Sequence, residues 1–336
     1  AARSRLVSLA LSGFGLPISS SRFRVMKGVS LWTRMRFGQF DPRETLTEKT
    51  PDRVSTDDTV QIIERWAISS GIETLLVRDG DKGLGAKGNF GRLLKASDRA
   101  YFMLCDQDDI GLPHKVEAAL NAVASAEREV GAKTPVLAHC GLKVVTEDLQ
   151  TIYPSFWTHQ RFHVTEAGRG ESGDPARKAL LIRNFVTGCA TIGNAALRTR
   201  ALPIPDESPM HDWWLALIAA HFGEIRAIDE PGLLYRQHMS NSLGAKDWSA
   251  RAMLEKLLTE PRAAVARSRY WFDMAKAQAR CIEAILNTET KEGSPPYLKA
   301  FAHINDASLL SRKTYMLRYG ISTQLRFHSL VTWMLL

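Results

Sequence analysis

The residues with the clearest potential for chemistry are three carboxylates that follow an apolar run. Residues 101–105 (YFMLC) lead directly into Asp106, Asp108 and Asp109. Neighbouring carboxylates repel one another, so either water solvates them or a positive charge holds them. Mg²⁺ and Mn²⁺ prefer oxygen ligands and often bind one or two carboxylates together with substrate phosphates. Asp106 and Asp108 are therefore candidate metal ligands. The alternative is a solvated turn in which Asp109 caps the next helix.

A second candidate is Asp212 in the segment His211-Asp212-Trp213-Trp214, which opens a helix after a Pro-rich loop. A carboxylate among aromatic side chains can have the raised pKa that a general base needs. The alternative is that Asp212 only complements the helix dipole while the tryptophans are core residues.

The third candidate is the segment 235–238 (YRQH). An Arg such as Arg236 suits phosphate recognition, and His238 could bind a metal or donate to a phosphate. The alternative for this pair is an ordinary surface loop.

The sequence around these residues predicts alternating strands and helices, which would position them. The segment 100–105 is apolar throughout, as expected for a strand buried on both faces. We therefore predict an α/β fold, with a sheet between helices, in which ligands bind beyond the carboxyl ends of strands. The predicted strands are 73–77, 100–105, 135–140, 142–146, a strand pair or a strand and turn in 184–197, 224–229 and part of 230–245. The predicted helices are 55–71, 90–97, 113–126, 211–223, 247–258 and 262–287.

Charge and cysteine content exclude some classes of protein. The 336 residues include 44 Lys/Arg and 36 Asp/Glu, but seven of the basic residues and none of the acidic ones lie in 1–40. The rest of the chain is nearly neutral and has no basic stripe, which argues against a nucleic-acid partner. The four cysteines have no CxxC spacing, so we expect reduced, buried thiols in a cytoplasmic protein.

In this order and spacing, the three motifs resemble family 2 glycosyltransferases of the GT-A fold, in particular the bacterial rhamnosyltransferase-like branch. The segments that carry the likeness are STDDT, LGAKGNFGRLL, YFMLCDQDDIGLPHK, NFVTGCATIGNAAL, LPIPDESPMHDWWLALIAAHFG and DEPGLLYRQHMSNSLGA. The resemblance implies a GT-A-type, Rossmann-like mixed sheet flanked by helices over 55–245. We expect a helical C-terminal extension over 246–336.

The resemblance also implies the reaction and its residues. Asp212 would take the proton of the acceptor hydroxyl during inverting transfer from a dTDP- or UDP-sugar, with Mn²⁺ or Mg²⁺ as cofactor. The acceptor would be a glycan or a lipid-linked glycan of a bacterial surface polysaccharide. The residues implied to bind the donor are Asp52, Asn89, Asp106, Asp108 and Arg236, and those implied to bind the metal are Asp108 and His238.

Two other functions compete with this one. A phosphohydrolase of the haloacid-dehalogenase kind also places Asp-x-Asp after an apolar strand, but it has no counterpart of HDWW or YRQH. The chain could instead be an inactive remnant of a glycosyltransferase, because the first strand and the Asp-Asp-Gly-Ser segment of the family are not recognisable in residues 1–54. We interpret 1–54 as an atypical N-terminal segment, either disordered or the product of a shifted reading frame.

The segment 313–336 mixes basic residues with Leu, Tyr, Phe and Trp. As an amphipathic helix it would give a cytoplasmic enzyme peripheral contact with the inner face of the membrane. The alternative is a helix that packs on the catalytic domain. The sequence contains no run of about 18 apolar residues, so it does not predict a membrane span.

Overall fold

The computed structural model describes residues 29–33, 46–52, 61, 64, 65, 68, 69, 73–78, 85–106, 108–160, 174–237 and 259–321. Its strands are β1 (Val29–Thr33), β2 (Leu46–Asp52), β3 (Glu73–Arg78), β4 (Tyr101–Cys105), β5 (Ile110–Gly111), β6 (Val136–Val145), β7 (Thr151–Tyr153), β8 (Thr191–Asn194) and β9 (Glu224–Arg236). Its helices are α4 (Gly85–Ala96), α5 (Lys115–Val130), α6 (Phe156–His159), α8 (Asp174–Ile182), α9 (Ala195–Ala201), α10 (His211–Phe222), α12 (Pro261–Glu289), α13 (Pro296–Ala302) and α14 (Leu309–Tyr319), with 3₁₀ turns η1 (Gly188–Ala190) and η2 (Ile304–Asp306).

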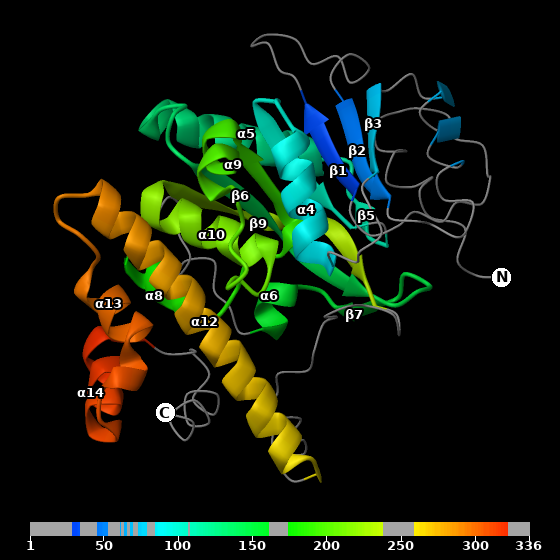
Figure 1. The fold of residues 1–336 in the computed structure, drawn as a ribbon. Coiled ribbons are helices and arrows are strands. Elements are labelled where there is room, and N and C mark those ends of the chain that lie inside the picture. The colour runs from blue at the N-terminus through cyan, green and yellow to red at the C-terminus, as the bar shows by residue number, and fades with distance from the viewer. Residues whose placement is uncertain are drawn as a thin grey trace.

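All nine strands form one mixed sheet, in the order β3-β2-β1-β4-β8-β6-β9-β5, with β7 paired to β6 (Figure 1). β6 and β9 run parallel, and β8 is antiparallel to both of its neighbours, β4 and β6. This arrangement confirms the predicted α/β fold with a mixed sheet flanked by helices. It also brings the end of β4 close to the end of β9, because β5 pairs with β9 directly after the acidic loop.

Alternate residues of β4 enter two separate cores. Phe102 and Leu104 pack into a large cluster with α4, α8, α10 and α12, whereas Tyr101 and Met103 face α5. This is the period-two alternation of a strand whose two faces are both covered. The buried strand is therefore fixed on both sides, and the loop that follows it starts from a rigid position.

Two local predictions are wrong. The two strands predicted in 135–146 are one strand, β6, and the two predicted in 224–236 are one strand, β9. Register shifts around Gly141 let these long strands stay paired where the sequence pattern breaks. The segment 184–197, predicted as a strand pair or a strand and turn, has the second form: the turn η1 and the strand β8, followed by the start of α9.

The N-terminal segment differs from the sequence-based prediction. We expected no recognisable strand in 1–54, but β1 and β2 lie there and join β4 to β3 in the sheet. The structure describes the backbone of these strands and not their side chains. Most of the helix predicted over 55–71, and the whole of 247–258, lie outside the described residues.

Helices α12, α13 and α14 form the C-terminal part of the described chain, as predicted for the extension. The C-terminal half of α12 shares the large core through residues such as Ala279 and Ile282, while its other end projects away from the sheet (Figure 1). No helix among the described residues is both long and apolar enough to cross a membrane.

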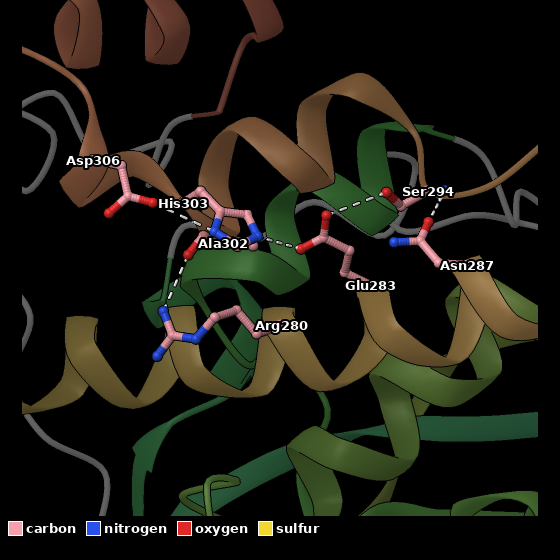
Figure 2. A network of polar contacts seen from close by, with 7 residues as sticks. All are labelled: Arg280, Glu283, Asn287, Ser294, Ala302, His303 and Asp306. Carbon is pink, nitrogen blue, oxygen red and sulfur yellow. Dashed lines mark hydrogen bonds and ion pairs between the residues drawn. The ribbon is translucent and has the colours of Figure 1, made fainter.

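A polar network ties α12 to the segment that follows it (Figure 2). The carboxylate of Glu283, on α12, lies 2.8 Å from Nε2 of His303 and 3.5 Å from the hydroxyl of Ser294. The other ring nitrogen of His303 lies 3.5 Å from Asp306. Because Glu283 is almost fully buried, these partners supply hydrogen bonds that water cannot.

Candidate active site

The loop after β4 is held in place by the last residue of β9. The backbone N–H of Arg236 donates to Oδ1 of Asp109 at 3.1 Å, and its Nε donates to the carbonyl of Asp108 at 2.7 Å. Arg236 is itself buried, at 8% exposure. The guanidinium thus fixes the shape of the acidic loop, a role that the sequence did not suggest for it.

The structure brings Asp106 together with Asp109 and Cys189. The donor atoms of these three side chains all lie within 4.8 Å of one another. Oδ2 of Asp109 is buried and has no hydrogen-bond partner among the described residues. A buried carboxylate oxygen without a partner is costly, which makes this cluster a fitting place for a cation.

The predicted metal ligands fall differently around this cluster. Asp106 belongs to it and Asp108 does not, whereas Asp109, considered from the sequence only as an alternative helix cap, does. His238 lies outside the described residues. Asp109 and Cys189 are thus candidate ligands that sequence reasoning missed, and no spacing in the sequence connects them.

The surroundings of Asp109 disfavour its charge. Burial raises the pKa of this carboxyl well above its usual range, and the neighbouring charge of Asp106 raises it further. Hydrogen bonds from the Cys189 thiol and the Arg236 backbone act in the opposite direction but do not cancel the shift. A bound divalent ion would reverse the balance by favouring the ionised carboxylates.

Lys115, the first residue of α5, contacts the backbone of Cys189. It is 7% exposed, and its Nζ donates to the carbonyl of Cys189 at 2.7 Å. Burial lowers its pKa, but the acidic groups around it, the thiols of Cys105, Cys140 and Cys189 and the carboxyl of Asp109, leave the pKa above its usual value. Lys115 was part of the quoted motif and received no role there. The structure makes it a buried cation of the site.

Asp212 lies in the first turn of α10 and is 9% exposed. Its Oδ2 accepts from the backbone N–H of Gly188 at 3.0 Å, and its Oδ1 accepts from that of Trp213 at 2.7 Å. Burial raises its pKa from 3.8 to about 6, although these hydrogen bonds oppose the shift. A carboxylate with this pKa is ionised at neutral pH and basic enough to accept a proton from a reacting group.

The turn η1 joins Asp212 to the acidic cluster. Gly188 donates its N–H to Asp212, while the next residue, Cys189, contributes its thiol to the cluster and its carbonyl to Lys115. A side chain at Gly188 would come within 3.0 Å of Nε2 of His211 and 3.5 Å of Asp212. A three-residue turn therefore sets the position of the candidate base relative to the candidate metal ligands.

Helix α4 lies against the start of α10. The ring of Phe90 stacks on that of His211 with centroids 4.0 Å apart, and the preceding Asn89 has its side-chain oxygen buried without a partner among the described residues. Lys87 donates to the carbonyls of Asp206 and Ser208, both at 2.9 Å, and so tethers the loop that leads into α10. Asn89, predicted to shape the donor pocket, precedes the residue of α4 that stacks on the start of α10, and its predicted role stays a prediction.

Asp52 is the last residue of β2, where its backbone pairs with Arg78 of β3. Its side chain lies outside the described part of the structure. Its predicted contact with the nucleotide therefore stays a prediction.

Comparison with known proteins finds a relative by sequence. No family model matches the chain. Over 200 residues, the chain is 26% identical to the dTDP-rhamnosyl transferase RfbG of Shigella flexneri, and the match covers 58% of this chain and 63% of that protein. The matched part is therefore less than two thirds of the relative's length.

Solved structures give a more distant likeness. S. aureus TarS 1-349 covers 82% of both chains at 13% identity with a TM-score of 0.45. The same protein in complex with UDP-GlcNAc gives 10% identity and a TM-score of 0.41 over 81% of this chain and 69% of that chain.

Proposed function

We propose that this chain is a glycosyltransferase that moves a sugar from a nucleotide-diphosphate donor to a glycan or lipid-linked glycan of a bacterial surface polysaccharide. The observation that carries the proposal is the pairing of a buried carboxylate of raised pKa, Asp212, with an acidic cluster through the turn η1. The sequence relationship to a dTDP-rhamnosyl transferase supports the same class of reaction. It also makes a dTDP-sugar, and rhamnose in particular, the first donor to test.

The reaction we propose is a direct displacement with inversion. Asp212 accepts the proton of the acceptor hydroxyl while that oxygen forms a bond to the anomeric carbon, and the bond between this carbon and the diphosphate oxygen breaks. The Gly188 and Trp213 N–H groups hold the carboxylate oriented during this step. Because inversion needs attack from the face opposite the leaving group, the base and the diphosphate must lie on opposite sides of the sugar.

The diphosphate end of the donor would lie at the acidic loop. Asp106 and Asp109 would hold a divalent ion there, and the sulfur of Cys189 belongs to the same cluster. The ion would stabilise the negative charge that develops on the leaving diphosphate. Arg236 and Lys115 keep this loop and η1 in position through the contacts described above. Asp52, Asn89, Asp108 and His238 remain proposed donor or metal contacts.

The C-terminal helix α14 offers a surface for membrane contact, where lipid-linked acceptors would be found. Leu310 and Leu317, seven residues apart, are 78% and 64% exposed. Lys313 and Arg318, also exposed, lie beside them. Exposed apolar side chains with basic neighbours favour the surface of an anionic bilayer, so we propose that the 313–336 segment contributes to such contact.

Product analysis tests the proposal. The chain is incubated with dTDP-rhamnose or a UDP-sugar and a surface-polysaccharide acceptor, and both nucleotide release and the anomeric configuration of the product are measured by NMR. Acceptor-dependent release with an inverted product is expected. Acceptor-dependent release with a retained configuration would refute the direct displacement. No transfer from any of these donors to any tested acceptor would argue against the function.

A further inference from the structure

We propose that Cys189 is a thiolate ligand of the metal site, together with Asp106 and Asp109, and that the site therefore favours Zn²⁺ or Cd²⁺ over Mg²⁺. The inference rests on the proposed donor site, but the metal can be measured without any donor. It starts from the donor atoms: a thiol sulfur and two carboxylate oxygens lie within 4.8 Å of one another.

Cys189 packs in a buried apolar cluster with residues such as Cys140 and Leu233, and its sulfur also lies beside the carboxylates of Asp106 and Asp109. Cys189 is 2% exposed, and two hydrogen bonds hold the backbone of η1 in place. The N–H of Gly188 donates to Asp212, and the carbonyl of Cys189 accepts from Lys115. The unpartnered Oδ2 of Asp109 is buried within the same cluster. An ion there would give this oxygen the partner that the described residues do not provide.

Without a metal, burial and the neighbouring charges of Asp109 and Asp106 raise the pKa of the Cys189 thiol well above its usual range, so the sulfur becomes a thiolate as the ion binds. On binding, a metal–sulfur bond forms and the thiol proton passes to solvent.

The chemical consequence is a change in metal preference. Carboxylates and water suit Mg²⁺ and Mn²⁺, whereas thiolates select softer ions such as Zn²⁺ and Cd²⁺. A site with two oxygens and one sulfur should therefore bind Cd²⁺ and Zn²⁺ more tightly than an all-oxygen site would.

The test uses the full chain after removal of metal by a chelator. Cd²⁺ is titrated, and the ultraviolet charge-transfer absorption of a thiolate–metal bond is recorded, while Zn²⁺ and Mg²⁺ affinities are measured by calorimetry. The wild type should show the band at one equivalent. Cys189→Ser should lose the band and bind Zn²⁺ at least about tenfold more weakly, while Mg²⁺ affinity changes by less than about twofold.

Two control thiols make the result specific. Cys140 is as buried as Cys189 and lies near the same lysine, and Cys281 lies on α12, outside the cluster. Cys140→Ser and Cys281→Ser should keep the band. A band that persists in Cys189→Ser, or one that is absent from the wild type, would overturn the proposal.

A second variant guards against loss of fold. Asp109→Asn keeps all four thiols and should weaken Zn²⁺ and Mg²⁺ binding together, with circular dichroism confirming the native fold for every variant. Metal affinities that Asp109→Asn leaves unchanged would refute its role as a ligand. If the band depends on Cys189 but no nucleotide binds, the proposed function fails while the metal site stands. If nucleotides bind with metal and no band appears, the thiolate proposal fails alone.

Discussion

Replacing Asp212 by Asn tests how the structure tunes its candidate base. The carboxyl is buried, and its pKa is raised from 3.8 to about 6. At pH values between these two pKa values, the carboxyl binds more protons in the folded protein than in the unfolded chain. The free energy of unfolding therefore falls as the pH rises through this window, by roughly 3 kcal/mol in total.

The variant Asp212→Asn cannot ionise, so this pH dependence should disappear. Between pH 4.5 and pH 7.5 the stability of the variant relative to the wild type should rise by about 2 kcal/mol, since most of the shift titrates in that interval. Its amide cannot accept from both the Gly188 and the Trp213 N–H groups as the carboxylate does, which costs about 1–3 kcal/mol at either pH.

Urea denaturation at the two pH values measures the effect. Asp206→Asn is the matched control, because that carboxylate lies exposed in the loop before α10, and its relative stability should be equal at both pH values. Transfer activity of Asp212→Asn should fall by about 10²–10⁴-fold, the usual contribution of a general base. A relative stability of Asp212→Asn that does not change with pH would refute the assigned burial and raised pKa.

Three further predictions concern the scaffold and the membrane. Gly193→Ala would place a Cβ 2.5 Å from the ring of Phe102; we expect a loss of about 1–3 kcal/mol in urea denaturation, and an unchanged midpoint would contradict this packing. Glu283→Ala removes the partner of His303 and should lower the melting temperature more than Glu283→Gln, which keeps a hydrogen bond; equal melting temperatures of the two variants would show that this hydrogen bond contributes no stability. Deleting 309–336 should abolish flotation with anionic liposomes, and equal flotation with and without this segment would rule out its membrane role.

Much of the fold follows from local sequence pattern. The strand 101–105 and the helices 211–222 and 261–289 have clear apolar patterns and end signals, and the structure has them close to the predicted bounds. The long strand β6 was divided in the prediction because Gly141 interrupts the pattern. Its pairing with β9 is a long-range interaction, which no local window contains.

The candidate site shows the same limit. Asp106 and Asp212 were identified because one directly follows an apolar strand and the other lies in the first turn of a helix. Cys189 was not, since its neighbours in the cluster are about 80 residues earlier in the chain and only the crossing of β8 between β4 and β6 brings η1 to them. Arg236 was identified for its type, but its contact with the Asp108 carbonyl depends on the pairing of β5 with β9.

The most direct test of the central claim is metal-dependent nucleotide binding. Thermal shifts are measured with dTDP, UDP and GDP, each with and without Mn²⁺ or Zn²⁺, for the wild type and for Asp106→Asn. We predict that one nucleotide stabilises the wild type only when a divalent ion is present, and that Asp106→Asn abolishes the shift. If no nucleotide stabilises the wild type with either ion, or if Asp106→Asn responds as the wild type does, the acidic cluster is not a donor site.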